Sequence, residues 1–317
     1  MNRRRGSLLI VTLWLVAVLS VLAITIARYL SLEVKLTKYH LAREQAKALA
    51  RSGVYLAMQR LAADLPEAVD WLGDDWSFDA TAPWLVPAAP GGDPGRDTHL
   101  EIVITDEERK LDLNSPRATQ NALTALAGLP QVAQAVVDAL DPPEPEREDR
   151  PEIPYYAKNG PMHALEELAD LPEMQEHPDA RAALTAESTV FADGRVNVNT
   201  ASALVLEAIK PPDLAGLIRM FVDRRGAGAD QQLGTADDCL LTSDAGSVQQ
   251  IADCLGADAA LVQNLVNDLS AQSVVFTIVS RGVVAVPPAR YQVTAVVRRH
   301  GCPAEGPEPC IVAWREG

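Results

Sequence analysis

The 317-residue chain has few of the residue types on which catalytic and metal centres depend. It contains only five histidines and four cysteines, and none of the patterns HExxH, GxSxG, GxGxxG or GxxxxGK(S/T) occurs. Templates for zinc proteases, serine hydrolases and nucleotide-dependent enzymes are therefore unsupported. Because the histidines are scattered and have no evident acid or thiol partner in the sequence, we do not expect an enzyme.

Basic residues are also scarce, with 28 Lys and Arg against 43 Asp and Glu, for a net charge of −15. A broad electrostatic surface for nucleic acid needs a basic face, so no nucleic-acid partner is expected. Apolar residues make up 48% of the chain and charged residues 22%. These fractions argue against wholesale disorder, and the length favours about two domains.

The N-terminus holds a long apolar run. Three arginines precede residues 6–27, which carry no charged side chain. A run of about 20 apolar residues is long enough to cross a bilayer, and the preceding arginines keep the N-terminus cytoplasmic. Three interpretations are open: a cleaved secretory signal, a plain single-span anchor, and a prepilin-type leader. The third is cut after a glycine that follows basic residues, and Gly6 before Ser7 fits it.

The sequence downstream favours the prepilin-type leader. Residues 28–65 contain no proline and a single glycine. Their apolar residues recur at three- and four-residue steps, which predicts one amphipathic helix continuous with the apolar run. A helix over residues 7–64 would be about 87 Å long. A plain anchor does not need this continuity, whereas a filament subunit uses the apolar half to pack against neighbours and the amphipathic half to support a head.

The soluble region predicts strands on either side of a helical segment. Residues 66–98 are rich in Pro, Gly and Asp and indicate an irregular connector. Residues 99–105 alternate like a half-buried strand, and 111–114 are a second short strand that would complete a hairpin. Further strands are expected at 274–281, 290–298 and 311–314. Helical patterns cover about 118–140, 163–185, 212–225, 247–253 and 258–270.

Two stretches of this region echo each other. Lys110-Leu-Asp-Leu-Asn-Ser115 resembles Arg195-Val-Asn-Val-Asn-Thr200, and each runs into a helical pattern. The Ser and the Thr fit helix N-caps, which indicates two strand-to-helix entries. The second stretch also resembles the opening of a helix-hairpin-helix element, so a membrane-anchored DNA-binding protein is an alternative. A helix-hairpin-helix element binds phosphate through the backbone amides of a Gly-x-Gly loop. The equivalent stretch here is Lys210-Pro-Pro-Asp-Leu214, which has no such loop and so disfavours this alternative.

Two acidic stretches are candidate calcium sites. Asp230, Asp237 and Asp238 lie on a glycine-containing loop, and calcium takes six to eight oxygen ligands of this kind. The EF-hand spacing is absent, so a solvated acidic loop without metal is the open alternative. Asp138 and Asp141 form a second candidate together with Glu144, from which Pro142 and Pro143 separate them.

The four cysteines fall into two neighbouring pairs. Cys239 and Cys254 follow the first acidic loop, and Cys302 and Cys310 enclose a Pro-rich segment. Neither pair has the CxxC spacing of zinc or redox sites. Export past the inner membrane favours disulfides. Of the three possible pairings we expect 239–254 and 302–310, with four free thiols as the alternative.

The N-terminus resembles the type IV pilin-like class. In most members the fifth residue of the processed chain is a glutamate, and counting from Ser7 gives Val11 instead. The missing glutamate, the stretches LDLN and VNVNT, and the order of elements resemble the general secretion pathway protein K family. Members of this family are the minor pseudopilins K of type II secretion systems.

The resemblance implies an α+β fold in which a pilin-like long N-terminal helix packs on an antiparallel sheet, with a large, mostly helical inserted domain. The implied organisation is a leader at 1–6, a transmembrane half-helix at 7–27, an amphipathic half at 28–65, a pilin-like domain at 66–114, the inserted domain at 115–271 and the last pilin-like strands at 272–317.

The resemblance also implies processing, partners and location. A prepilin peptidase would cut between Gly6 and Ser7, Ser7 would be N-methylated, and calcium would bind in the helical domain. A single span would hold the protein in the inner membrane, with its C-terminal domain in the periplasm. With minor pseudopilins I and J it would form the tip of a pseudopilus of further subunits, help initiate assembly, and push folded proteins across the outer membrane. A minor pilin of a type IV pilus is the last alternative, which Val11 and the insertion disfavour.

Overall fold

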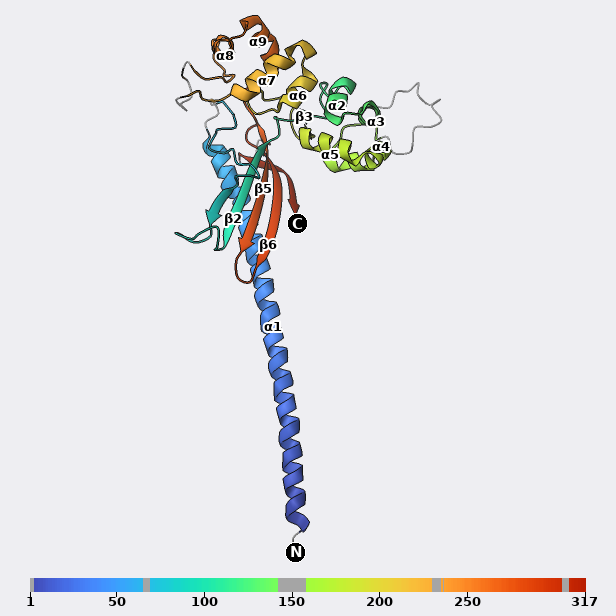
Figure 1. The fold of residues 1–317 in the computed structure, drawn as a ribbon, viewed down its shortest axis with the longest axis vertical. Helices are drawn as coiled ribbons and strands as arrows, with labels where there is room; N and C mark the ends of the chain where they lie inside the picture. The colour runs from blue at the N-terminus through green and yellow to red at the C-terminus, as the bar shows by residue number, and fades with distance from the viewer. Residues whose placement is uncertain (1–2, 65–68, 142–157, 230–234, 236, 304–307) are drawn as a thin grey trace, which may run out of the picture.

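The molecule is a long stalk that carries a head at one end (Figure 1). The computed structural model describes residues 3–64, 69–141, 158–229, 235, 237–303 and 308–317. Helix α1 forms the stalk, and its C-terminal part enters the head, which consists of a sheet and a group of short helices. The N-terminus lies at the free end of the stalk, and the C-terminus lies in the head.

Helix α1 (Arg3–Ala63) is one continuous helix of 61 residues, which confirms the predicted continuity. Every side chain from residue 10 to residue 41 is exposed, because no other part of the described chain packs against this half. Small and apolar residues then face the sheet at three- and four-residue steps. The fully or almost fully buried members of this stripe are Ala42, Ala46, Ala50, Val54, Ala57 and Leu61.

A five-stranded antiparallel sheet packs against the C-terminal part of α1. Its strand order is β1-β2-β5-β6-β7, and buried residues such as Ile102, Phe276 and Val293 form a core with the α1 stripe. This arrangement confirms the predicted α+β, pilin-like fold. The strands are β1 (Trp84–Pro87), β2 (His99–Asp106), β5 (Val275–Val284), β6 (Ala289–Arg298) and β7 (Cys310–Glu316).

Two glycines allow α1 to approach the sheet closely. A Cβ atom on Gly282 of β5 would lie 2.0 Å from the backbone oxygen of Ala46. A Cβ on Gly53 of α1 would lie 2.1 Å from Oγ of Ser280, also on β5. Because such distances are impossible for real atoms, glycine at these two positions sets the spacing between helix and sheet.

The predicted hairpin between 99–105 and 111–114 is wrong. Strand β2 pairs with β1 on one side and β5 on the other, so neither of its edges is open to the next segment. Strand β3 (Leu111–Asp112) instead pairs in parallel with β4 (Ser188–Thr189), outside the main sheet. Strand β1 lies within the stretch predicted to be irregular, and its backbone pairing with β2 outweighs the Pro- and Gly-rich surroundings.

Short helices make up the segment between the strands. Where the sequence predicts one helix over 118–140, the structure has two, because Gly128 ends the first with φ of 72° and Pro130 begins the second. The pattern at 163–185 is likewise divided by prolines at helix starts. The elements are α2 (Gln120–Ala127), α3 (Pro130–Leu140), η2 (Leu165–Asp170), α4 (Pro172–Glu176), α5 (Pro178–Glu187), α6 (Ala203–Ile209), η3 (Pro212–Leu214), α7 (Ala215–Arg224), α8 (Ser247–Leu255) and α9 (Ala259–Val266).

The sequence echo corresponds to two structurally similar entries. Leu113 N donates to Thr189 O at 2.9 Å, and Val198 N donates to Ser270 O at 3.0 Å, so each entry is closed by a parallel bridge from a later segment. The N-caps are Thr119 and Ser202, which lie after the Ser and Thr predicted for that role. Buried apolar side chains from both halves form one shared core.

Candidate functional sites

The exposed half of α1 is chemically suited to lipid or to other apolar helices. The helix Ile10–Ala63 is long and apolar enough to cross a membrane, with a mean hydropathy of 2.7 in its most apolar window. Ser20 and Thr25 donate their hydroxyl hydrogens to the backbone oxygens of Val16 and Val21, each at 2.8 Å. These two hydroxyl donors are therefore satisfied within the helix itself, as an apolar environment requires.

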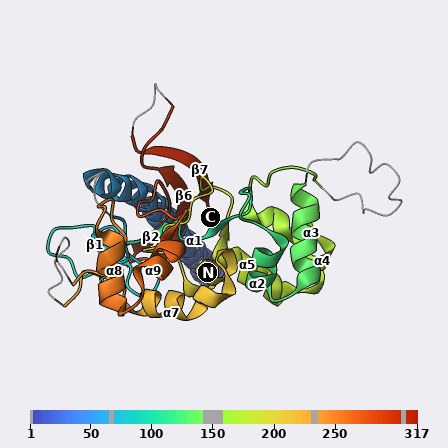
Figure 2. The ribbon, with the colours of Figure 1, turned by 90° about the horizontal axis from the view of Figure 1, so that it is seen from above.

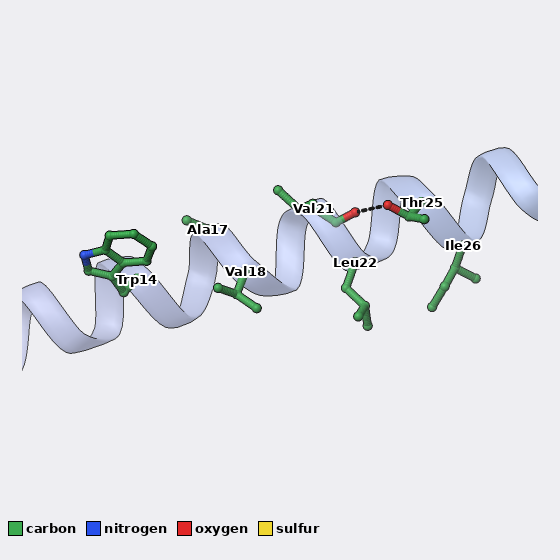
Figure 3. Close-up of a pocket in the computed structure, with 7 residues that line it drawn as sticks. All are labelled: Trp14, Ala17, Val18, Val21, Leu22, Thr25 and Ile26. Atoms are coloured by element: carbon green, nitrogen blue, oxygen red, sulfur yellow. Dashed lines mark hydrogen bonds between the residues drawn. The ribbon is translucent and has the colours of Figure 1, made fainter.

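A shallow apolar groove of about 410 Å³ follows one face of this half of α1. Figure 3 shows Trp14, Val18, Leu22 and Ile26 in successive turns along it, with Ala17 between the larger side chains. Residues spaced by four lie on one helix face, and a small residue between large ones makes a depression for a neighbouring side chain. The face is thus shaped for packing against a helix or lipid tails.

The residues of the predicted leader belong to the same helix. Gly6 and Ser7 lie within α1 near its N-terminus. Val11, the fifth residue counted from Ser7, is 60% exposed on the helix surface. An apolar side chain here is compatible with a bilayer interior, where an unpaired carboxylate would be costly.

Both predicted disulfides are present. Cys239 bonds to Cys254 with a Cα–Cα distance of 5.8 Å, and Cys302 bonds to Cys310 with 6.0 Å. The first bond attaches the chain after the acidic loop to α8. The second joins the segment after β6 to the first residue of β7, so it fixes the start of that strand.

Two carboxylates of the first acidic loop converge on Thr235. Its hydroxyl donates to Asp237 Oδ1 at 2.8 Å, and its backbone N–H donates to Asp238 Oδ2 at 3.2 Å. Ala229 N donates to Asp237 Oδ2 at 2.7 Å, which brings both ends of the loop together. The third candidate ligand, Asp230, lies outside the described residues.

The second acidic candidate lies elsewhere in the head. Asp138 is on α3, where it accepts a hydrogen bond of 2.8 Å from Gln134 Nε2, and Asp141 is the C-cap of that helix. Helix α3 and helix α8, next to the first acidic loop, lie at opposite ends of the head (Figure 2). The two candidate calcium sites are therefore separate, and their residues do not form one ligand set.

A buried ion cluster lies where α1 meets the rest of the head. Arg299 is 3% exposed and pairs with Asp64 at 2.7 Å and with Asp70 at 2.5 Å. Carboxylate oxygens of Asp64, Asp70 and Asp74 lie within 4.8 Å of one another. Burial raises the pKa of Asp74 to about 7 and also raises the pKa of Asp64. This cluster is not predictable from the sequence, because Arg299 is 229 residues from Asp70 and no local motif signals the pairing.

A second buried network joins the sheet to the inserted helices. Asp106 at the end of β2 accepts hydrogen bonds from the hydroxyls of Thr200 at 2.5 Å and Ser273 at 2.7 Å. Asn197 donates to Ser273 Oγ at 2.8 Å, and Glu108 accepts a hydrogen bond from the backbone N–H of Val274, the residue before β5. Burial raises the pKa of Asp106 to about 6 and that of Glu108 to about 8. The echoed stretch 195–200 thus anchors the insertion to the sheet.

Comparison with known proteins identifies a similar fold. No family model and no curated protein matches the chain by sequence. Among solved structures, a chain from the crystal structure of the GspK-GspI-GspJ complex of the type 2 secretion system of enterotoxigenic Escherichia coli is similar. The match has a TM-score of 0.58 at 16% sequence identity and covers 89% of this chain and 99% of that chain. The chain therefore has the fold of a subunit from that secretion complex.

Proposed function

We propose that this protein is a minor pseudopilin of a type II secretion system. The observation that carries the proposal is the fold match over 89% of the chain to a subunit of a GspK-GspI-GspJ complex. The continuous 61-residue α1 supports it, because an apolar stalk that carries a folded head is the form a pilus-like subunit needs. Its role is structural rather than catalytic.

The proposed location follows from the two ends of the apolar run. The basic residues before residue 6 stay in the cytoplasm, and the head lies in the periplasm. A prepilin peptidase cuts between Gly6 and Ser7, Ser7 is then methylated, and the apolar half of α1 anchors the protein in the inner membrane. The two disulfides are consistent with a head in an oxidising compartment.

The proposed position is the tip of the pseudopilus, in complex with minor pseudopilins I and J. Helices α6 to α9 sit at the end of the head farthest from the N-terminus (Figure 1), where they would obstruct the addition of a further subunit. Separate apolar cores for the sheet with α1 and for the inserted helices support a pilin-like domain with an insertion at 115–271. Growth of the filament below this tip would push folded proteins towards the outer membrane.

Calcium binding belongs to the same proposal. Asp237 and Asp238 supply carboxylate oxygens on one turn, and calcium ligands are oxygens of this type. With Asp230 they are the proposed ligand residues, and the Cys239–Cys254 disulfide holds the adjoining chain in place.

The proposal is tested by the intact mass of the protein isolated from membranes with and without a co-expressed prepilin peptidase. Loss of residues 1–6 that depends on the peptidase, with one added methyl group, is the expected result. An unchanged mass in the presence of an active peptidase would contradict processing and would indicate that α1 is a plain membrane anchor. Cleavage near Ala27 would make the protein a soluble export and would overturn the filament role.

A further inference from the structure

The two edges of the sheet differ in how they are protected. Strand β1 has four residues and ends at Pro87, which has no N–H to donate. Strand β7 has seven residues and leaves Ile311, Val312 and Trp314 exposed by 37%, 52% and 36%. Natural sheets blunt open edges with short strands, proline or charge to prevent unwanted pairing. Edge β1 is blunted in this way, whereas β7 is long and presents apolar side chains.

The hydrogen-bond register shows which backbone groups of β7 face away from the sheet. Gly317 and Gln292 exchange two backbone hydrogen bonds of 3.1 Å. Hydrogen-bonded and non-hydrogen-bonded pairs alternate along an antiparallel ladder. Glu316 and Trp314, one and three residues before Gly317, are therefore in non-hydrogen-bonded pairs with β6. Their N–H and C=O groups face the open edge.

Strand β7 is held in place at both ends. Its first residue, Cys310, is bonded to Cys302. At its other end, Glu316 accepts hydrogen bonds from Arg51 of α1 at 2.7 and 3.0 Å and from the Tyr291 hydroxyl of β6 at 2.9 Å. An edge that is already ordered loses little conformational freedom when another strand pairs with it.

An apolar groove of about 720 Å³ lies beside this edge, between the sheet and the inserted helices. Val296, Ala313 and Val312 line it from the sheet, and Leu165 and Phe191 line it from the insertion. Val296 alternates with the α1-facing residues of β6, so the groove lies on the face of the sheet opposite α1. In Figure 1, β7 is on the side of the sheet that faces the α2 to α5 group.

The charges of the groove favour an acidic side chain in its occupant. Lys110 pairs with Glu107 at 2.9 Å, and Arg315 pairs with Glu166 across the groove. Arg181 also lines the groove and forms no ion pair with any residue that the structure describes. A carboxylate that enters the groove would therefore find a guanidinium whose charge is not already compensated by a described acid.

We propose that β7 is a strand-addition site for a partner protein. An extended segment pairs with the outward backbone groups of Trp314 and Glu316, places apolar side chains in the groove and directs an acidic side chain to Arg181. An extended strand is the occupant because it alone matches a row of alternating backbone donors and acceptors. The choice of partner, a neighbouring minor pseudopilin, rests on the proposed function.

The test uses the full chain in detergent, with purified minor pseudopilins I and J of the same secretion system as binding probes. Trp314→Pro removes the ring and the outward N–H, whereas Trp314→Ala removes only the ring. Neither change removes a β6–β7 ladder bond, because Trp314 is in a non-hydrogen-bonded pair. Strand addition predicts that the proline variant binds about five- to tenfold more weakly than the alanine variant.

Amide hydrogen exchange on the unmutated chain gives a second, independent readout. Exchange at Trp314 and Glu316 should slow when the partner binds, while Ala313 and Arg315, already bonded to β6, should change little. Equal binding of the two variants, or no added protection, would overturn strand addition even if the wild type binds I or J. Binding to neither probe would overturn the proposed function as well, and the same protection in the chain alone would identify a second copy as the occupant and overturn the choice of partner.

Discussion

Asn199 holds the backbone of Leu241 with two hydrogen bonds, one from its Nδ2 to the backbone oxygen and one to its Oδ1 from the backbone N–H, both 2.9 Å long. Asn114, its counterpart in the sequence echo, does the same to Met162 at 2.9 and 2.8 Å. Each half of the insertion therefore uses the last Asn of its echo to fix a segment more than forty residues further along. The sequence echo therefore corresponds to a repeated structural feature, an Asn side chain that makes two hydrogen bonds to the backbone of one distant residue.

Replacement of Asn199 should destabilise the head. Asn199 is 1% exposed, and Asn199→Ala removes the partners of two part-buried backbone groups of Leu241, which costs about 2–4 kcal/mol of unfolding free energy. Asn114→Ala should cost less, because the Asn114 side chain itself is exposed whereas that of Asn199 is buried. Denaturant unfolding measures both, with Asn121→Ala, an exposed site on α2, as the control. Equal effects at Asn199 and Asn121 would contradict this role.

The packing of α1 on β5 should not tolerate a methyl group at Gly282. Gly282→Ala places Cβ against the backbone of Ala46, which can move only if helix and sheet separate. Overpacking of this kind costs about 1–3 kcal/mol. Gly216→Ala on α7 is a matched control, since a Cβ there meets nothing within 4 Å and should stabilise the helix by about 1 kcal/mol. Thermal unfolding should therefore shift in opposite directions, and a shared direction would refute the close-packing argument.

Arg299, the residue after β6, should be more important for stability than an exposed arginine within that strand. Arg299→Ala leaves Asp64 and Asp70 as unpaired, partly or fully buried carboxylates, at a cost of about 3–5 kcal/mol. Arg290→Ala, at an exposed position of β6, should change little. The comparison is made by denaturant unfolding at pH 7, and a small effect of Arg299→Ala would show that the cluster does not hold α1 to the head.

The buried network at the junction predicts a loss of stability at alkaline pH. Burial raises the pKa of Glu108 from 4.5 to about 8, so the folded chain keeps a proton that the unfolded chain releases. The resulting stabilisation is complete below pH 4.5 and is lost as the pH rises through about 8. Burial also raises the pKa of Asp106 from 3.8 to about 6, so its contribution to stability is likewise lost as the pH rises through about 6.

Glu108→Gln isolates this contribution, because an amide stays neutral throughout. Its melting temperature should fall less than that of the wild type between pH 6 and pH 9, while Glu44→Gln, at an exposed site of α1, should follow the wild type. Parallel curves for wild type and Glu108→Gln would show that the carboxyl does not titrate in this range.

The sequence predicted those elements whose formation depends on residues close together in the chain. The continuity of α1 and the strands β5 and β6 are visible as periodicity, and the disulfides were predicted from neighbouring pairs of cysteines in a head that the sequence predicts to be exported. Strand β1 and the true partner of β3 were not predictable, because pairing between distant segments overrides local composition. The same holds for Arg299 with Asp70 and for Thr200 with Asp106, whose hydrogen bonds span 229 and 94 residues.

If the chain is a subunit of a type II secretion system, protein secretion by its own host depends on it. Deletion of its gene should leave folded exoproteins in the periplasm, and the wild-type gene should restore their release. A Gly6→Val gene, whose product the peptidase would not cut, should fail to restore it although the protein is present in membranes. Unchanged secretion after the deletion would contradict the account.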